Sequence, residues 1–277
     1  VSFARKKQVA VNENISAQQV KANIFGMDKF RDRFLQGFMF PTEDFFSPFI
    51  MGYVMISLNA ENYTADLNTD VVAMYLKGRQ APDGQWSYPL ADTRPPLCLS
   101  HVSQTALAMR ALQLYAPKAS RASYDKSVEL AAKWMAKEAA PSTEDLSWKV
   151  LGLAWADREQ AAKRRAMDNL LAMQRSDGGW SDLPTMESSV YQTGKALYAL
   201  YVAGLATSDA AYQKGVRYLL ANQQEDGTWH VKTRALGFQP YLEVGFPHGY
   251  DQWMSTAGSG WAVMALTATL PDKTASR

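Results

Sequence analysis

The sequence of 277 residues predicts an all-α fold, an α/α toroid in which an inner ring of helices lies inside an outer ring. Three observations predict it: a corner motif that recurs along the chain, hydrophobic residues at helical spacing between the corners, and alternation of amphipathic with wholly apolar helices. A composition of 47% hydrophobic and 20% charged residues allows a sizeable core. We expect one domain over residues 1–277, built from about five to six helical hairpins.

The corner motif has the pattern Q-x-x-D-G-x-W. The last two copies are 49 residues apart and the first two are 94 apart, close to two such periods. The copy expected between them is degraded, because residues 136–143 contain no Asp-Gly pair. The motif residues are Gln80, Asp83, Gly84 and Trp86, then Gln174, Asp177, Gly178 and Trp180, then Gln223, Asp226, Gly227 and Trp229.

Each motif residue type suits a tight connection between two helices. Asp-Gly forms a turn, since Gly adopts positive φ and Asp bonds the neighbouring backbone. The Gln amide at a helix end can reach exposed carbonyl groups or the next loop. The Trp offers a large apolar face and one N–H donor, and is expected to stack over the turn or the Gln. These residues are therefore predicted to be structural.

The helices between the corners fall into two classes. Amphipathic helices are expected for the outer ring, and more apolar helices rich in small residues for the inner ring. The first residues, 1–9, resemble the tail of a sixth inner helix. The outer ranges are 17–37, 67–80, 163–174 and 209–223, and the inner ranges are 47–59, 102–115, 146–156, 190–202 and 255–269.

The inner helices also share a local pattern. Ser103-Gln104-Thr105-Ala106 and Tyr191-Gln192-Thr193-Gly194 both precede an Ala-Leu pair. Corners of this type, followed by such helices, resemble squalene-hopene cyclase and its relatives, which share an α/α toroid with protein prenyltransferases. The resemblance covers nearly the whole chain and implies an apolar or isoprenoid-type ligand in a central cavity.

More narrowly, the segment 230–253 is similar to bacterial proteins with prenyltransferase/squalene-oxidase repeats. Members often carry a cytochrome-c-like C-x-x-C-H segment just upstream, which this sequence lacks, so no cofactor is identified. The resemblance suggests a periplasmic or secreted location rather than a cytoplasmic one.

The acid of squalene-hopene-type cyclases is missing at the matching position. Their D-x-D-D-T-A run protonates an alkene, whereas this sequence has His101-Val102-Ser103-Gln104-Thr105-Ala106 there. A displaced acidic pair, Glu144 and Asp145, occupies the equivalent register of another inner helix. It could supply a general acid, or it could follow a Ser142 or Thr143 N-cap and favour the helix N-terminus.

No metal site is expected. Protein prenyltransferases bind zinc through an Asp-x-Cys pair and a distant His, but Cys98 has Pro96 where the Asp should be. A clip formed by Cys98 and His101 would lack further cysteine ligands, because the sequence has one cysteine.

The long connection between Trp229 and Gln252 is the strongest candidate for a functional loop. Its aromatic content argues for order, and it carries varied polar groups that are costly to bury. A functional interpretation makes Glu243 or Asp251 an acid, His248 a base or a polar anchor, and Arg234 an anion clamp. The alternative is a buried aromatic plug whose polar groups satisfy one another. The candidate ligand-binding residues are His101, Gln104, Tyr191, Gln192, His230, Arg234, Gln239, Tyr241 and Trp253.

Three functions remain open on the sequence. The first is an isoprenoid-binding or isoprenoid-converting toroid, and the second a non-catalytic ligand- or protein-binding module of a periplasmic redox-associated protein. The third is a carbohydrate-active toroid with Glu243 and Asp251 as paired carboxylates. A net charge of +2 gives no argument for nucleic acid, and no apolar run reaches the length of a membrane span.

Overall fold

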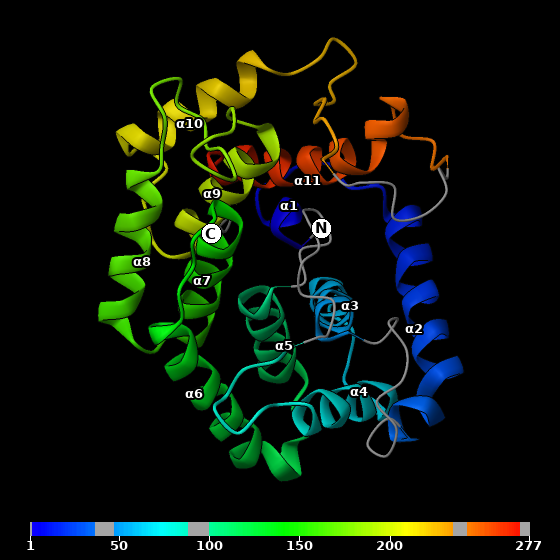
Figure 1. The fold of residues 1–277 in the computed structure, drawn as a ribbon. Helices are drawn as coiled ribbons and strands as arrows, with labels where there is room; N and C mark the ends of the chain where they lie inside the picture. Colours follow the sequence, from blue (N-terminus) through cyan, green and yellow to red (C-terminus); the bar gives the residue numbers. More distant parts are fainter. Residues whose placement is uncertain (1, 37–46, 88–99, 235–242, 272–277) are drawn as a thin grey trace, which may run out of the picture.

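The computed structural model describes residues 2–36, 47–87, 100–234 and 243–271 (Figure 1). Within these ranges every regular element is a helix, apart from an isolated bridge between Trp180 and Ser189. The predicted all-α toroid is confirmed. Inner helices surround the middle of the molecule in Figure 1, and outer helices run around them.

The inner ring is formed by the helices expected to be most apolar. Four of them begin at a serine N-cap whose hydroxyl accepts a backbone N–H from the first turn, which fixes where each helix starts. Neighbours around the ring pack in chain order. The inner helices are α3 (Pro48–Ala60), α5 (His101–Tyr115), α7 (Thr143–Ala156), α9 (Val190–Val202) and α11 (Gln252–Ala268).

The outer ring contains one helix that the sequence prediction omitted. Helix α6 was missed because the corner that should follow it is degraded. The structure also starts α2 four residues earlier than expected, and α7 and α11 three residues earlier. The outer helices are α2 (Glu13–Gln36), α4 (Leu67–Gly78), α6 (Arg121–Lys137), α8 (Gln160–Ala172) and α10 (Ala210–Ala221).

The short helix α1 (Ser2–Lys6) lies between the last hairpin and the first. Phe3 packs against two tyrosine rings of α9, with centroids 6.1 and 5.7 Å away. Arg5 bonds Glu61 at the end of α3, and the Lys7 side chain donates to the Leu270 carbonyl after α11. This placement agrees with the expected tail of an inner helix.

The corner tryptophans are buried, and each one bonds both the helix before it and the helix after it. Each indole N–H donates to a carbonyl in the last turns of the preceding outer helix: Trp86 to Leu76 at 2.6 Å, and Trp180 to Leu170 at 2.7 Å. Each backbone N–H donates to a hydroxyl of the following inner helix. The pairs are Trp86 with Thr105, Trp180 with Thr193, and Trp229 with Ser259.

The corner glutamines hold the turn, as predicted. The amide of Gln80 donates to the Gly84 and Ser127 carbonyls, both at 2.9 Å. Gln174 makes the same two kinds of bond, to Gly178 and to Ala211. Since Ser127 and Ala211 belong to the next outer helices, each of these corners joins three helices.

Small residues let the inner helices approach closely. A Cβ atom at Gly52 would lie 2.6 Å from the Leu107 side chain, and one at Gly194 would lie 2.7 Å from the Ala262 backbone. In the described ranges no helix combines the length and the apolar character that crossing a bilayer requires.

Candidate functional site

A carboxylate lies inside the ring, in the first turn of α7. Glu144 is 1% exposed, and Lys195 of α9, which forms an ion pair with it, is 0% exposed. Trp148 Nε1 and the Tyr191 hydroxyl also donate to Glu144 Oε1, at 3.1 and 3.3 Å, and Gln192 Nε2 donates to Oε2 at 3.4 Å. All four groups donate to the carboxyl oxygens, which is the arrangement that suits an ionised carboxylate.

Aromatic rings surround the lysine of this pair. The Lys195 ammonium lies 4.1 Å from the centroid of the Trp148 ring, 5.3 Å from that of Trp261 and 5.6 Å from that of Tyr191. A desolvated cation gains from the negative faces of such rings. These aromatic rings and the Glu144 carboxylate together offset the cost of burying the Lys195 ammonium.

The aromatic contacts extend from Trp148 across the toroid. Tyr53 of α3 contacts Trp148 of α7 with centroids 5.9 Å apart, and Trp148 contacts Trp261 of α11 at 6.1 Å. Trp261 in turn contacts Tyr198 of α9 at 5.9 Å. Helix α5 lies between α3 and α7, and α9 lies between α7 and α11. Aromatic side chains therefore meet across the middle of the toroid at this level.

Three of the sequence candidates meet in this cluster. Glu144, Tyr191 and Gln192 lie together, as described above, and Gln104 is buried on α5. His101 is exposed at the start of α5. Sequence reasoning missed Lys195, although a lysine inside an otherwise apolar helix is a signal that could have singled it out.

The two carboxylates of the displaced acidic pair have different roles. Ser142 caps α7 by accepting the Asp145 N–H at 3.1 Å, and its hydroxyl bonds the Asp145 carboxylate at 3.0 Å. The capping interpretation therefore describes Asp145. It does not describe Glu144, because the Glu144 side chain turns inward to Lys195.

Asp251 joins the described parts of the 230–252 connection through hydrogen bonds. Its carboxylate bonds the His230 ring and accepts the Thr233 N–H, both at 2.7 Å. The rings of His230 and His248 are stacked with centroids 5.0 Å apart, and His248 Nε2 lies 2.9 Å from the Thr228 hydroxyl. These polar groups do bond one another, but the described part of the loop is not the buried aromatic plug of the alternative interpretation, because Tyr250 is 79% exposed.

The protonation of Asp251 disfavours its candidate role as an acid. Partial burial raises the pKa of Asp251, but the bonds from Thr233 and His230 lower it by more, so the net shift is downward. A general acid at neutral pH needs the opposite shift. In this structure Asp251 accepts the bonds that hold the loop, and the lowered pKa favours its ionised form.

The other candidate residues of the loop differ in their contacts and exposure. Arg234, the candidate anion clamp, forms an ion pair with Asp182 at 3.0 Å, and Asp182 also accepts the Glu144 N–H at 3.4 Å. Glu243 is exposed and accepts the Gly245 N–H at 2.8 Å. Trp253 is 41% exposed. The remaining candidates, Gln239 and Tyr241, lie outside the described residues, as does Cys98.

No metal centre is found in the described part of the chain, where no three His, Cys, Asp or Glu side chains are grouped to hold an ion. The pairing of Glu243 with Asp251 as catalytic carboxylates stays a prediction.

Comparison with known proteins finds similar sequences over part of the chain. Residues 157–256 match the family model of the squalene-hopene cyclase C-terminal domain. The chain is 31% identical over 128 residues to a squalene-hopene cyclase of Bradyrhizobium diazoefficiens, an alignment that covers 39% of this chain and 18% of that protein. It is 35% identical over 108 residues to one of Zymomonas mobilis, covering 38% of this chain and 15% of that protein. The matched part thus spans less than a fifth of either cyclase. With the two rings of helices, these matches show a terpenoid-cyclase-like toroid with squalene-cyclase repeats.

Proposed function

We propose that this squalene-cyclase-like toroid binds an apolar, isoprenoid-type chain at the aromatic residues of its inner ring and does not cyclise it by protonating an alkene. The observation that carries the proposal is the aromatic run from Tyr53 through Trp148 and Trp261 to Tyr198. Tyr53 is 37% exposed, although it lies on an inner helix. An apolar ligand can lie against its ring with the buried indoles behind it.

The residues at the two candidate positions support a function without an alkene-protonating acid there. The first turn of α5 carries His101, Ser103 and Gln104 where an acid run would be needed. The carboxyl group of Glu144 accepts bonds from an ammonium and three neutral donors, and these contacts suit an acceptor rather than a proton donor.

Ligand binding is tested by mass spectrometry of an organic extract and by quenching of tryptophan fluorescence with farnesol, geranylgeraniol and squalene. Tyr53→Ala should weaken binding about tenfold, because it removes one aromatic contact surface. Tyr53→Phe should bind like the wild type, and Phe25→Ala, which removes a 66% exposed ring from the outer helix α2, should have no effect. A cyclised product that disappears in Glu144→Gln would contradict the non-protonating mechanism.

A second candidate function, a non-catalytic protein-binding module of a periplasmic redox-associated protein, is favoured by one feature. Aromatic side chains from alternate inner helices already contact one another across the middle of the ring. Side chains that fill the centre leave less room for a small ligand there, and binding would then fall to the outer surface. If no polyprenyl compound binds and Tyr53→Ala changes nothing, this second function is the better account.

A further inference from the structure

Two of the corners also pack tightly against the next outer helix, and we call this tightly packed turn a wedge. A Cβ atom at Gly84 would lie 2.5 Å from the Leu130 carbonyl of α6, and one at Gly178 would lie 2.6 Å from the Lys214 carbonyl of α10. The glutamine amides bond the same two helices one turn earlier. These two corners therefore fill the space between their own hairpin and the outer helix that follows.

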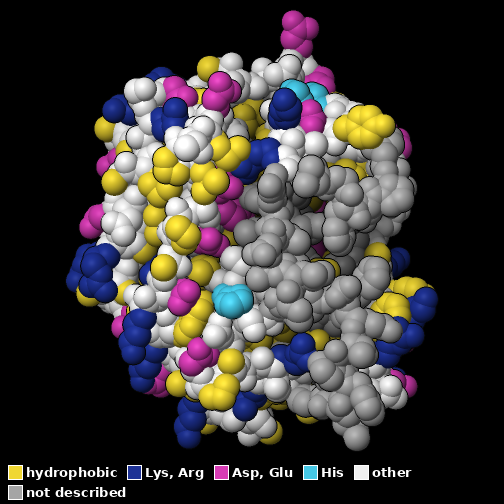
Figure 2. All heavy atoms as spheres, in the orientation of Figure 1, with side chains coloured by type: hydrophobic (Ala, Val, Ile, Leu, Met, Phe, Trp, Pro, Cys, Tyr) yellow, Lys and Arg dark blue, Asp and Glu magenta, His cyan; other side chains and the backbone are white. Residues whose placement is uncertain are grey.

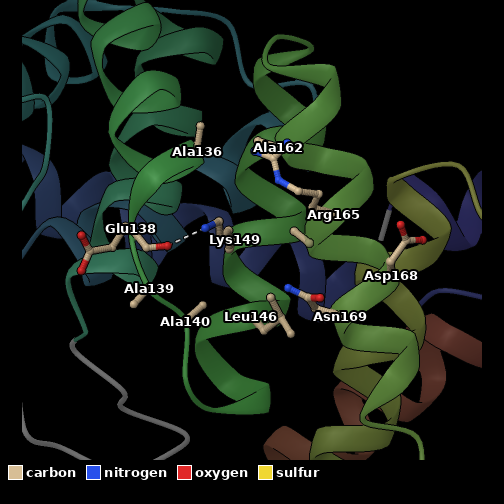
Figure 3. Close-up of a pocket in the computed structure, with 11 residues that line it drawn as sticks. Ala136, Glu138, Ala139, Ala140, Leu146, Lys149, Ala162, Arg165, Asp168 and Asn169 are labelled. Atoms are coloured by element: carbon tan, nitrogen blue, oxygen red, sulfur yellow. Dashed lines mark hydrogen bonds between the residues drawn. The ribbon is translucent and has the colours of Figure 1, made fainter.

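The connection from α6 to α7 lacks this wedge. Only residues 138–142 separate the two helices, and they contain neither the Asp-Gly turn nor the Trp. By analogy with the intact corners, the missing wedge would pack against α8. A pocket of about 340 Å³ lies there, between the end of α6, α7 and α8 (Figure 3). The degraded repeat has left an open space in the outer layer.

The walls of this pocket combine small apolar side chains with polar and charged ones, two cations among them. Lys149 comes from α7 and Arg165 from α8, and the Asn169 side chain adds an amide. Figure 3 shows the carboxylates of Glu138 and Asp168 at opposite sides, pointing away from the two cations. The apolar lining is Ala136, Ala139, Ala140, Leu146, Ala162 and Ala166.

Lys149 has charges of both signs near it. Burial lowers the pKa of Lys149, the Glu138 carboxylate raises it, and Arg165 lowers it by less than Glu138 raises it, so the net shift is downward. The ammonium donates to the Glu138 carbonyl oxygen, which is neutral. Across the described residues no carboxylate lies within ion-pair distance of Lys149 or Arg165. A bound anion would compensate both charges.

We propose that this pocket binds a small organic anion, with a carboxylate head at Lys149 and Arg165 and a short apolar chain on the alanine walls. The volume lies at the lower end of the range for small-molecule sites, which suits a medium-chain monocarboxylate. The site lies between α6, α7 and α8, away from Tyr53, so it does not depend on the function proposed above.

The test uses the full chain and isothermal titration with octanoate, 1-octanol and inorganic phosphate. Octanoate should bind at least about tenfold more tightly than 1-octanol, which lacks the charge-assisted hydrogen bonds. Lys149→Met and Arg165→Met should each weaken octanoate binding about tenfold and leave 1-octanol binding unchanged. Arg164→Met, on the same helix but outside the pocket lining, is the matched control and should bind octanoate like the wild type.

A second pair of variants tests the cavity itself. Ala139→Trp, at the exposed rim of the pocket, should fill it and abolish octanoate binding, whereas Ala161→Trp on α8 should not. Circular dichroism checks that both variants fold. The proposal is overturned if octanoate does not bind, if its binding survives Lys149→Met, Arg165→Met and Ala139→Trp, or if phosphate binds as tightly with the same dependence on Lys149.

Discussion

Removing the buried cation of the inner ring should destabilise the protein strongly. Lys195→Met keeps a chain of similar length among the rings of Trp148 and Trp261, but it leaves the Glu144 carboxylate buried without its ammonium partner. Both side chains of the pair are at most 2% exposed, so water cannot replace the lost charge.

The expected loss follows from the cost of an uncompensated buried charge, about 3–5 kcal/mol in the free energy of unfolding. For a chain of this size about 2 °C of melting temperature corresponds to 1 kcal/mol, which gives a decrease of roughly 6–10 °C. Lys133→Met breaks the exposed ion pair with Glu129, whose side chains are 55% and 44% exposed. Its effect should be far smaller than that of Lys195→Met, because water and salt already screen an exposed pair.

The assay is urea unfolding followed by circular dichroism, with a double-mutant cycle. Glu144→Gln removes the charge but keeps an acceptor for Trp148 Nε1 and the Tyr191 hydroxyl. The double variant should therefore recover about 2–3 kcal/mol relative to the sum of the two single changes. The reasoning is refuted if Lys195→Met costs no more than Lys133→Met, or if the two changes in the cycle are additive.

Two further predictions concern a corner and the functional loop. Gly178 (φ +87°) and Gly204 (φ +105°) both have positive φ, but only at Gly178 would a Cβ atom meet the Lys214 carbonyl, at 2.6 Å. Gly204→Ala should cost about 1–2 kcal/mol and Gly178→Ala at least about 2 kcal/mol more, measured by thermal unfolding, and equal losses would contradict the wedge. The lowered pKa of Asp251 means that its stabilising contribution is present above its unfolded pKa, about 3.9, and is lost as the pH falls through the folded value. The stability difference between the wild type and Asp251→Asn should therefore be constant above about pH 5 and shrink below about pH 4, and a difference that persists unchanged at pH 2 would exclude this linkage.

Local patterns predicted most of the helices and the roles of the corner glutamines. The interval 190–202 was predicted with the bounds that the structure gives, because its apolar period starts directly after the Ser189 N-cap. The amide of each corner glutamine donates to the carbonyl of the glycine four residues later, so this contact lies within one short segment of the sequence. Helix α6 escaped prediction because its end carries none of these signals.

The candidate site depended on contacts between distant segments. Glu144 and Lys195 are 51 positions apart, and neither helix alone shows that their side chains converge. Asp251 was a candidate acid on the sequence, and only its bonds to His230 and Thr233 show that it is held as a carboxylate.

The sequence by itself determined that this protein is a ring of helical hairpins, since turns, caps and hydrophobic periods act over a few residues. Only the tertiary structure decided what occupies the middle of the ring and what the degraded repeat leaves open. The aromatic contacts across the ring and the pocket at Lys149 and Arg165 both arise where helices far apart in the chain come together. Their chemistry is set by burial and neighbouring charge, which no local pattern encodes. On the face drawn in Figure 2, hydrophobic, basic and acidic side chains lie intermixed over the described surface.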